Sequence, residues 1–211
     1  MKIKKYTYIM LAVLLFSGTA CSDFLDKEYD ATLSDEKVFT NQTMTREFLT
    51  DIYTNLPDGL APLNDDQFTG ASRDCMTDNA TSYWGLHYYT KVATDSYTAK
   101  DHPLLGQWNT DFAGIRKCNI FLNNAQASVV GNAEKSGDDN KLYERYCNEA
   151  RLLRALFHFD LVCWFGDMLI VGENEDGTNI VFSMENPEQM NQARTPAADV
   201  LQWVADECDK V

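Results

Sequence analysis

The feature that most constrains the fold of this 211-residue chain is a helical repeat of apolar residues between residues 139 and 164. Apolar side chains recur there every three or four residues, which is the spacing of one face of an α-helix. Charged residues lie between them, and Gly166 follows as a helix stop. The apolar stripe consists of Leu142, Tyr146, Ala150, Leu153, Phe157 and Leu161. The pattern predicts one long amphipathic helix over 139–164.

Two earlier segments share this spacing. One runs from Thr43 to about residue 56, where Pro57-Asp58-Gly59 ends it. The other begins after Pro103 and continues to about residue 122. Both predict helices. The expected apolar face of the first is Met44, Phe48, Ile52, Tyr53 and Leu56, and that of the second is Leu104, Trp108, Phe112, Ile115, Asn119 and Leu122.

A last helix is predicted after residue 194, with Thr195 as N-cap and Pro196 at the first helical position. Its expected buried face is Val200, Leu201, Val204 and Cys208. Residues 60–103 are expected to form a long irregular insertion, 168–171 a short extended run and 180–182 one strand. The fold class is therefore mostly α with long irregular loops. No Gly or Pro closes the last helix, so we expect a helical array that is incomplete at its C-terminus.

The first twenty residues have the pattern of an export signal. Lys2, Lys4 and Lys5 precede an apolar run to Phe16, which is shorter than the ~20 residues needed to span a membrane. Small residues directly before Cys21 favour lipoprotein processing, in which this cysteine becomes the lipidated N-terminus; ordinary cleavage near residue 20 is the alternative. The predicted organisation is a signal peptide (1–20), a lipid-anchored tether (21–42) and a helical domain (43–211).

Composition excludes several classes of protein. Charged residues make up 24% and aromatic residues 12% of the chain, which excludes a disordered or collagen-like protein. The net charge is −14, and beyond the N-terminal lysines the basic residues are scattered, which argues against a nucleic-acid partner.

The cysteines and histidines predict neither a metal site nor another cofactor. Beyond Cys21 no C-x-x-C pair occurs, and the three histidines lack the spacing of a metalloprotease. We expect the thiols to be small buried apolar groups. They are Cys75, Cys118, Cys147, Cys163 and Cys208.

Four stretches, in matching order and spacing across nearly the whole chain, resemble the SusD/RagB family of outer-membrane nutrient-binding lipoproteins. They are Cys21–Asp26, the helix with Trp108, Ile115 and Cys118–Leu122, the run from Glu149 to Asp167, and Arg194-Thr195-Pro196. The resemblance implies tetratricopeptide-like helix pairs, a lipid anchor in the outer membrane at the cell surface, and a SusC-like TonB-dependent transporter as partner. It also implies an oligosaccharide or peptide ligand, and no catalysed reaction. Family members are longer, so we expect an N-terminal portion.

The candidate ligand-binding residues lie in the 60–103 insertion. Sugar rings lay their apolar faces on aromatic rings, while charged and amide groups bond the hydroxyls. The candidates are Arg73, Asp78, Tyr83, Trp84 and Tyr88. The alternative is that these rings pack the insertion against the helices. Glu149 and Arg151 are expected to pair with a neighbouring loop or cap a helix rather than to catalyse.

The predicted function is capture of a glycan or peptide nutrient for a transporter. One alternative is a helical-repeat module that docks onto a protein and binds no ligand of its own. Another is a glycoside hydrolase that uses two carboxylates. No nucleophile elbow, phosphate loop or dinucleotide motif occurs in the sequence, and we expect no enzymatic activity.

Overall fold

The computed structural model describes residues 35–57, 73–81, 88–98, 100, 104–131, 139–183, 189 and 191–211. The chain divides into two compact units, Met1–Lys37 and Val38–Val211. Only residues 35–37 of the first unit are described, and everything below concerns the second. The predicted signal peptide and Cys21 lie outside the described residues.

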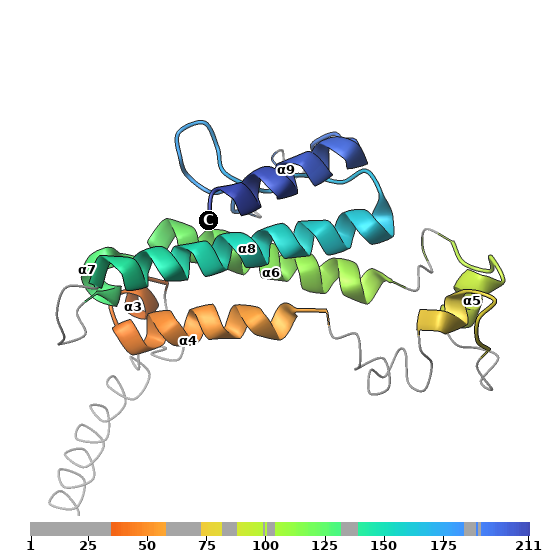
Figure 1. The fold of residues 1–211 in the computed structure, drawn as a ribbon, viewed down its shortest axis with the longest axis horizontal. Helices are drawn as coiled ribbons and strands as arrows, with labels where there is room; N and C mark the ends of the chain where they lie inside the picture. The colour runs from red at the N-terminus through yellow and green to blue at the C-terminus, as the bar shows by residue number, and fades with distance from the viewer. Residues whose placement is uncertain are drawn as a thin grey trace, which may run out of the picture. The chain divides into compact units, whose positions relative to one another are not determined.

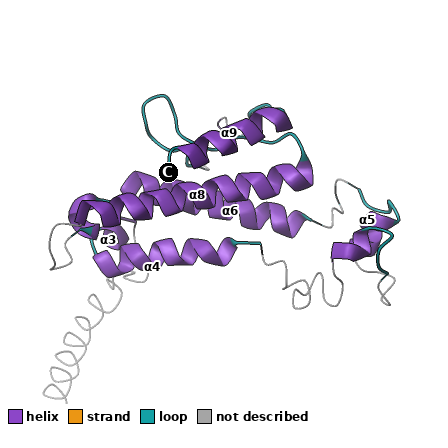
Figure 2. Ribbon diagram, in the orientation of Figure 1, coloured by secondary structure: helices purple, strands orange, loops and turns teal. Residues whose placement is uncertain are grey.

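Helices dominate the described part of the chain (Figures 1 and 2). They are α3 (Asp35–Phe39), α4 (Gln42–Ile52), η1 (Tyr53–Asn55), η3 (Arg73–Met76), α5 (Tyr88–Ala93), α6 (Leu105–Asn124), α7 (Ala127–Val130), α8 (Asp139–Phe165) and α9 (Ala197–Asp209). Among these residues, no helix combines the length and the apolar character needed to cross a membrane. The prediction of a mostly α fold is confirmed.

The strand expected at 180–182 is wrong. In the part of 139–211 that the structure describes, β pairing consists of two isolated bridges, Met168 with Thr195 and Glu173 with Asn179. The backbone N–H of Ile180 donates to the carbonyl of Gly172 at 2.9 Å, so this segment folds back on the chain just before it.

Helices α6, α8 and α9 form two antiparallel pairs that share α8, which lies between the other two in Figure 1. Gly114 of α6 faces Phe157 of α8 so closely that a Cβ on Gly114 would lie 2.6 Å from the phenyl ring. A glycine at this position therefore lets the two helices approach each other. Gly166, with φ of 68°, ends α8 as predicted, in a left-handed conformation that favours glycine.

The apolar stripe predicted on α8 forms the core. Tyr146, Ala150, Leu153, Phe157 and Leu161 are all buried, and Leu142 is partly buried against them. From α6, the core receives Ile115, Cys118 and Phe121.

Helix α4 also forms where predicted, and its apolar face is partly the predicted one, since Ile52 is buried and Phe48 and Leu56 pack against the core. Leu49 and Ile52 are buried, whereas Met44 and Tyr53 are 38% and 43% exposed. Asn41 precedes the helix, and its Oδ1 accepts a hydrogen bond from the N–H of Met44 at 3.1 Å. This N-cap fixes where the helix begins. Helix α3, which periodicity did not predict, adds Phe39 to the core.

The start of α9 differs from the prediction. Pro196, and not Thr195, is the N-cap residue, and its own side chain makes no capping hydrogen bond. The Oδ1 of Asp167, just after α8, accepts from the N–H of Ala197 at 2.8 Å. Thr195 pairs with Met168 through two backbone hydrogen bonds of 2.8 and 3.1 Å. The capping group is therefore supplied by a residue distant in sequence.

The buried face of α9 is only partly the predicted one. Val200 is fully buried, but Leu201 is 44% exposed and Cys208 is exposed. Glu207, one position earlier, is buried in place of Cys208. A charged residue lies there because α8 supplies a buried cation opposite to it.

The five described cysteines are free thiols. Cys75 and Cys118 are buried as expected, and burial raises the pKa of Cys118 to about 12. Cys147 is partly buried, while Cys163 and Cys208 are exposed, so the expectation of buried thiols is wrong for these two.

Candidate functional site

Of the predicted ligand-binding residues, the structure describes little. Tyr83 and Trp84 lie outside the described residues. The backbone of Arg73 belongs to η3 and that of Tyr88 to α5. Asp78 lies exposed in the turn after η3. These positions remain predictions, and the described geometry gathers functional groups elsewhere, between α6, α8, α9 and the segment 167–182.

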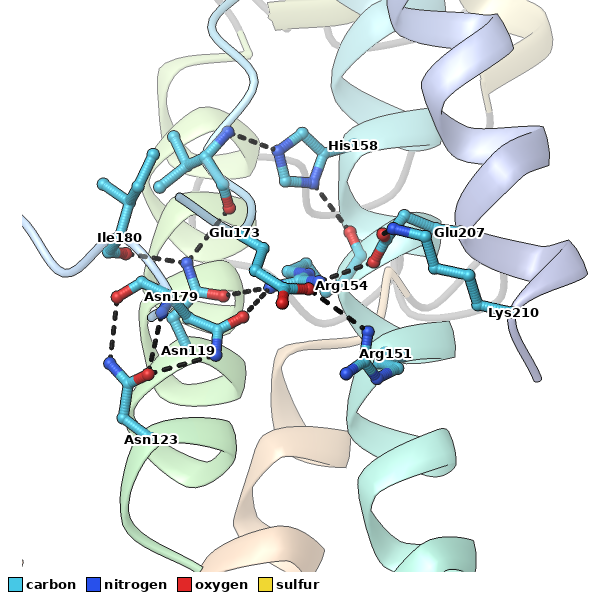
Figure 3. A network of polar contacts seen from close by, with 11 residues as sticks. Asn119, Asn123, Arg151, Arg154, His158, Glu173, Asn179, Ile180, Glu207 and Lys210 are labelled. Atoms are coloured by element: carbon cyan, nitrogen blue, oxygen red, sulfur yellow. Dashed lines mark hydrogen bonds and ion pairs between the residues drawn. The ribbon is translucent and has the colours of Figure 1, made fainter. Parts of the chain in front are cut away.

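A buried polar junction joins these elements (Figure 3). At its centre is Arg154 of α8, whose side chain is fully buried. The Nη1 atom donates to Asn119 Oδ1 at 2.8 Å and to Asn179 Oδ1 at 2.5 Å, and Nη2 donates to Glu207 Oε2 at 2.5 Å. One guanidinium therefore links α6, α9 and the segment after α8. We call Asn119, Arg154, His158, Asn179 and Glu207 the polar junction.

Asn119 joins two backbone segments, one at Val171 and the other at Ile180. Its Nδ2 donates to the carbonyls of Val171 and Ile180, at 3.0 and 2.7 Å. These carbonyls are nine residues apart in the chain, on either side of the 173–179 turn. The amide therefore satisfies two acceptors that would otherwise be buried without partners.

Asn123, one turn further along α6, binds the segment that contains Ile180, at Asn179. Its Nδ2 donates to the Asn179 carbonyl at 2.9 Å, and its Oδ1 accepts from the Asn179 backbone N–H at 2.8 Å. An exposed side chain thus pairs with the backbone as a neighbouring strand would. Both ends of the strip from Asn179 to Ile180 are therefore fixed to α6.

His158 binds the other segment, at Val171. Its Nε2 accepts a hydrogen bond from the Val171 N–H at 3.1 Å, so Nδ1 carries the proton and donates to the Arg154 carbonyl at 2.8 Å. Burial lowers the pKa of His158 to about 4, and the nearby Arg154 cation adds to that shift. The ring is neutral at physiological pH, and its role in this arrangement is structural.

The one carboxylate of the junction is held by two cations. Glu207 is 1% exposed, and Lys210 Nζ lies 2.5 Å from its Oε1 while Arg154 holds Oε2. Burial alone would raise the pKa of Glu207, but the hydrogen bonds from Lys210 and Arg154 outweigh it and lower this pKa. Arg154 also lies against the Trp203 ring, with Cζ 5.7 Å from the centroid. Since the carboxylate of Glu207 is ionised and both of its oxygens are paired, the junction is suited to holding the fold together and not to proton transfer.

Arg151, one turn before Arg154, pairs with the loop, as the sequence predicted. Its Nη1 lies 3.5 Å from Glu173 Oε2 on the 173–179 turn (Figure 3). Glu149 pairs with Arg145 at 3.3 Å and accepts from the Tyr53 hydroxyl at 3.3 Å. Glu149 thus pairs with its own helix and with η1, and not with a loop as predicted.

Two hollows share the lining residue Ile180. The first, of about 270 Å³, is almost wholly apolar and is lined by Phe112, Ala113, Ile115, Arg116, Val171, Ile180 and Phe182. The second, of about 260 Å³, is rich in side-chain amides and is lined by Asn174, Asn179, Ile180, Val181, Gln189 and Gln192. We call them the apolar hollow and the amide hollow. Within the described part of the chain, no three potential metal ligands come together.

The sequence contained a signal for the junction. Asn119 occupies an apolar helix face, where an amide must find buried partners. Arg154 and His158 are spaced i, i+4 on α8 and therefore project from one side of it. Glu207 gave no signal, because its position on α9 resembles that of an ordinary exposed residue. Neither hollow could be predicted, since each depends on how the 171–182 segment folds back.

Comparison with known proteins places this geometry in a family. Residues 23–207 match the SusD-like family described as starch-binding and associating with the outer membrane. A crystal structure of a SusD-like carbohydrate-binding protein from Bacteroides fragilis is similar in fold, with a TM-score of 0.58 and 24% identity. The similarity covers 82% of this chain and 31% of that one. A search of curated proteins finds no match.

Proposed function

This chain belongs to the SusD-like family, and from that premise we propose that it is a cell-surface lipoprotein that captures a nutrient glycan, or a peptide, and delivers it to a SusC-like TonB-dependent transporter. The observation that carries the proposal is the family match over residues 23–207. The family is one of carbohydrate-binding proteins of the outer membrane and is generally non-enzymatic, so we propose that this chain catalyses no reaction.

The chain spans 31% of the length of the similar solved protein. Ligand capture by this portion is supported by its helical scaffold, in which the polar junction holds the segment after α8 against α6 and α8. The aromatic insertion that contains Trp84 is proposed as one contact with the ligand.

Binding is tested by titrating the chain with neutral oligosaccharides, with maltoheptaose, cellohexaose and mannohexaose as the panel, in an isothermal calorimeter. We expect saturable binding of at least one of them, and quenching of tryptophan fluorescence that Trp84→Ala diminishes. A chain that binds none of the panel and no short peptide would contradict the proposal.

Membrane attachment is a separate part of the proposal. The small residues before Cys21 support lipidation at this thiol. Cys21→Ala should move the protein from the membrane to the soluble fraction of cells that express the full chain. Cys75→Ala is the matched control and should leave fractionation unchanged. If the Cys21 variant stays in the membrane fraction, the anchor is not at this residue.

A second candidate function, docking onto a protein without ligand binding, is favoured by an exposed apolar row on α8. Leu152, Leu156 and Phe159 are 41–45% exposed and recur at helical spacing, so they share one face of the helix. Purification with the transporter should weaken in Leu156→Glu if this face docks. A variant that co-purifies normally would leave this face without a docking role.

A further inference from the structure

We propose that the apolar and amide hollows together form a binding site for a neutral oligosaccharide, laid across the strip from Asn179 to Phe182. The inference rests on the proposed function in that it takes the ligand to be a glycan. It adds a site whose lining residues lie outside the 60–103 insertion.

The two hollows have one lining residue in common, Ile180. At about 270 and 260 Å³, each falls just below the roughly 300 Å³ at which small-molecule pockets begin. A ligand that filled one hollow alone would be small. A chain of linked rings that crosses Ile180 would use both.

The apolar hollow offers what the face of a sugar ring requires. Phe112 and Phe182 are partly exposed aromatic residues beside the side chains of Ile115 and Val171. The C–H face of a pyranose packs on such rings. Arg116 is exposed at this hollow, and Nη1 donates to the Phe182 carbonyl, which leaves its other N–H groups for ligand hydroxyls.

The amide hollow offers what the ring hydroxyls require. Gln189 and Gln192 are exposed, and no hydrogen bond joins their side chains to another described residue. Each free amide can both donate and accept, which matches a hydroxyl group. Asn179 differs, because its amide is already committed to Arg154 and Asn123. The two glutamines are therefore the side chains expected to bond the ligand.

Charge indicates that the ligand is neutral. The whole chain carries a net charge of −14, yet none of the described residues that line the two hollows is an Asp or a Glu. Arg116 is the one charged residue among them. A cationic ligand would find no counter-charge there, and an anionic ligand would find a single cation.

The floor of the site is held in place before any ligand arrives. Asn119 holds the carbonyls of Val171 and Ile180, His158 holds the Val171 N–H, and Asn123 holds Asn179 on both sides of its peptide. A preformed surface loses little conformational entropy on binding. The polar junction therefore supports this site.

The test is an NMR titration of the ¹⁵N-labelled chain with each of maltoheptaose, cellohexaose and mannohexaose. For the sugar that binds, we expect the side-chain NH₂ signals of Gln189 and Gln192 and the backbone signals of 179–182 to shift. The double variant Gln189→Ala/Gln192→Ala should weaken the Kd about tenfold through two lost hydrogen bonds. Gln202→Ala, an exposed glutamine of α9 that does not line either hollow, is the matched control and should bind as the wild type does.

A second variant tests the apolar hollow without emptying it. Phe182→Leu keeps an apolar side chain and removes the ring, and we expect the Kd to weaken about fivefold. Thermal unfolding of each variant should match the wild type.

The outcomes separate the two proposals. If a sugar binds but the glutamine double variant binds it unchanged while Trp84→Ala abolishes binding, the proposed function stands and this site is overturned. If the wild type binds none of the three sugars, this site is overturned together with the proposed glycan ligand.

Discussion

Helix α8 presents two very different sides to its neighbours. Toward α6 it buries Ala150, Leu153 and Phe157 in a seam that closes on Gly114. Toward α9 and the strip after α8 it buries Arg154 and His158, each with named hydrogen-bond partners. The first side contributes free energy in proportion to the area it removes from water. The second contributes position, because each polar group must meet its partner or remain unpaired at a cost.

The apolar side and the polar side of α8 therefore position different neighbours. The apolar seam brings α6 and α8 together but would tolerate other side chains of similar volume. The polar junction sets the path of residues 167–182, which contain no strand and no helix among the described residues and therefore need side chains to satisfy their backbone.

The sharpest test of this difference is to substitute methionine for one residue on the polar side of α8 and for one on its apolar side. Arg154→Met leaves Oε2 of the buried Glu207 and two asparagine oxygens without their partner, while Lys210 still pairs with Oε1, and should lower the free energy of unfolding by about 3 kcal/mol. Phe157→Met nearly conserves volume and should cost less than about 1.5 kcal/mol. Urea denaturation of both variants decides the matter. Equal losses would mean that the polar side is no more demanding than the apolar one.

Acid should weaken the polar side selectively. The pKa of His158 is about 4 in the folded chain, against about 6.5 when unfolded. Above pH 6.5 the ring is neutral in both states and its contribution is complete. As the pH falls from 6.5 toward 4, the unfolded chain takes up the proton first, so about 3 kcal/mol of stability is lost.

The measurement is urea denaturation at pH 7.5, 6.0 and 4.5 for wild type and His158→Gln. The stability difference between the two chains should shrink as the pH falls, because the carboxylates common to both cancel. A difference that stays constant across this range would show that His158 is not buried as a neutral ring.

The apolar seam should in turn be sensitive to added volume. Gly114→Ala places a methyl group 2.6 Å from the Phe157 ring and should cost about 2 kcal/mol by forcing the helices apart. The double variant Gly114→Ala/Phe157→Leu should recover part of that loss, as denaturation midpoints would report. If the single substitution is neutral, α6 and α8 do not approach as closely as described.

The smallest effect concerns the start of α9. Asp167→Ala removes the acceptor of the Ala197 N–H and should cost about 1 kcal/mol. Thr195→Ala is the matched substitution at the residue that sequence alone favours as the cap, and it should cost less. The reverse order in thermal unfolding would restore Thr195 as the N-cap.

The sequence predicted the apolar side well and the polar side poorly. Periodicity placed α8 within one residue of its observed end, because packing on α6 follows from the spacing of Ala150, Leu153 and Phe157. Periodicity could not predict that Glu207 is buried, since this depends on a cation fifty-three residues earlier. The cap supplied by Asp167 and both hollows likewise depend on chain reversal after α8, which no local pattern encodes. The resemblance identified the stretches around Asn119 and Arg154 without assigning them a structural role.

The central claim is that the polar junction makes the strip after α8 a fixed part of the scaffold. Native-state hydrogen exchange at the Val171 and Ile180 amides tests it most directly, since their N–H groups bond to His158 Nε2 and the Gly172 carbonyl. The account predicts protection close to that of the Phe157 amide in the core of α8, so that all three exchange through global unfolding. Exchange of Val171 and Ile180 at the rate of an open loop would contradict it.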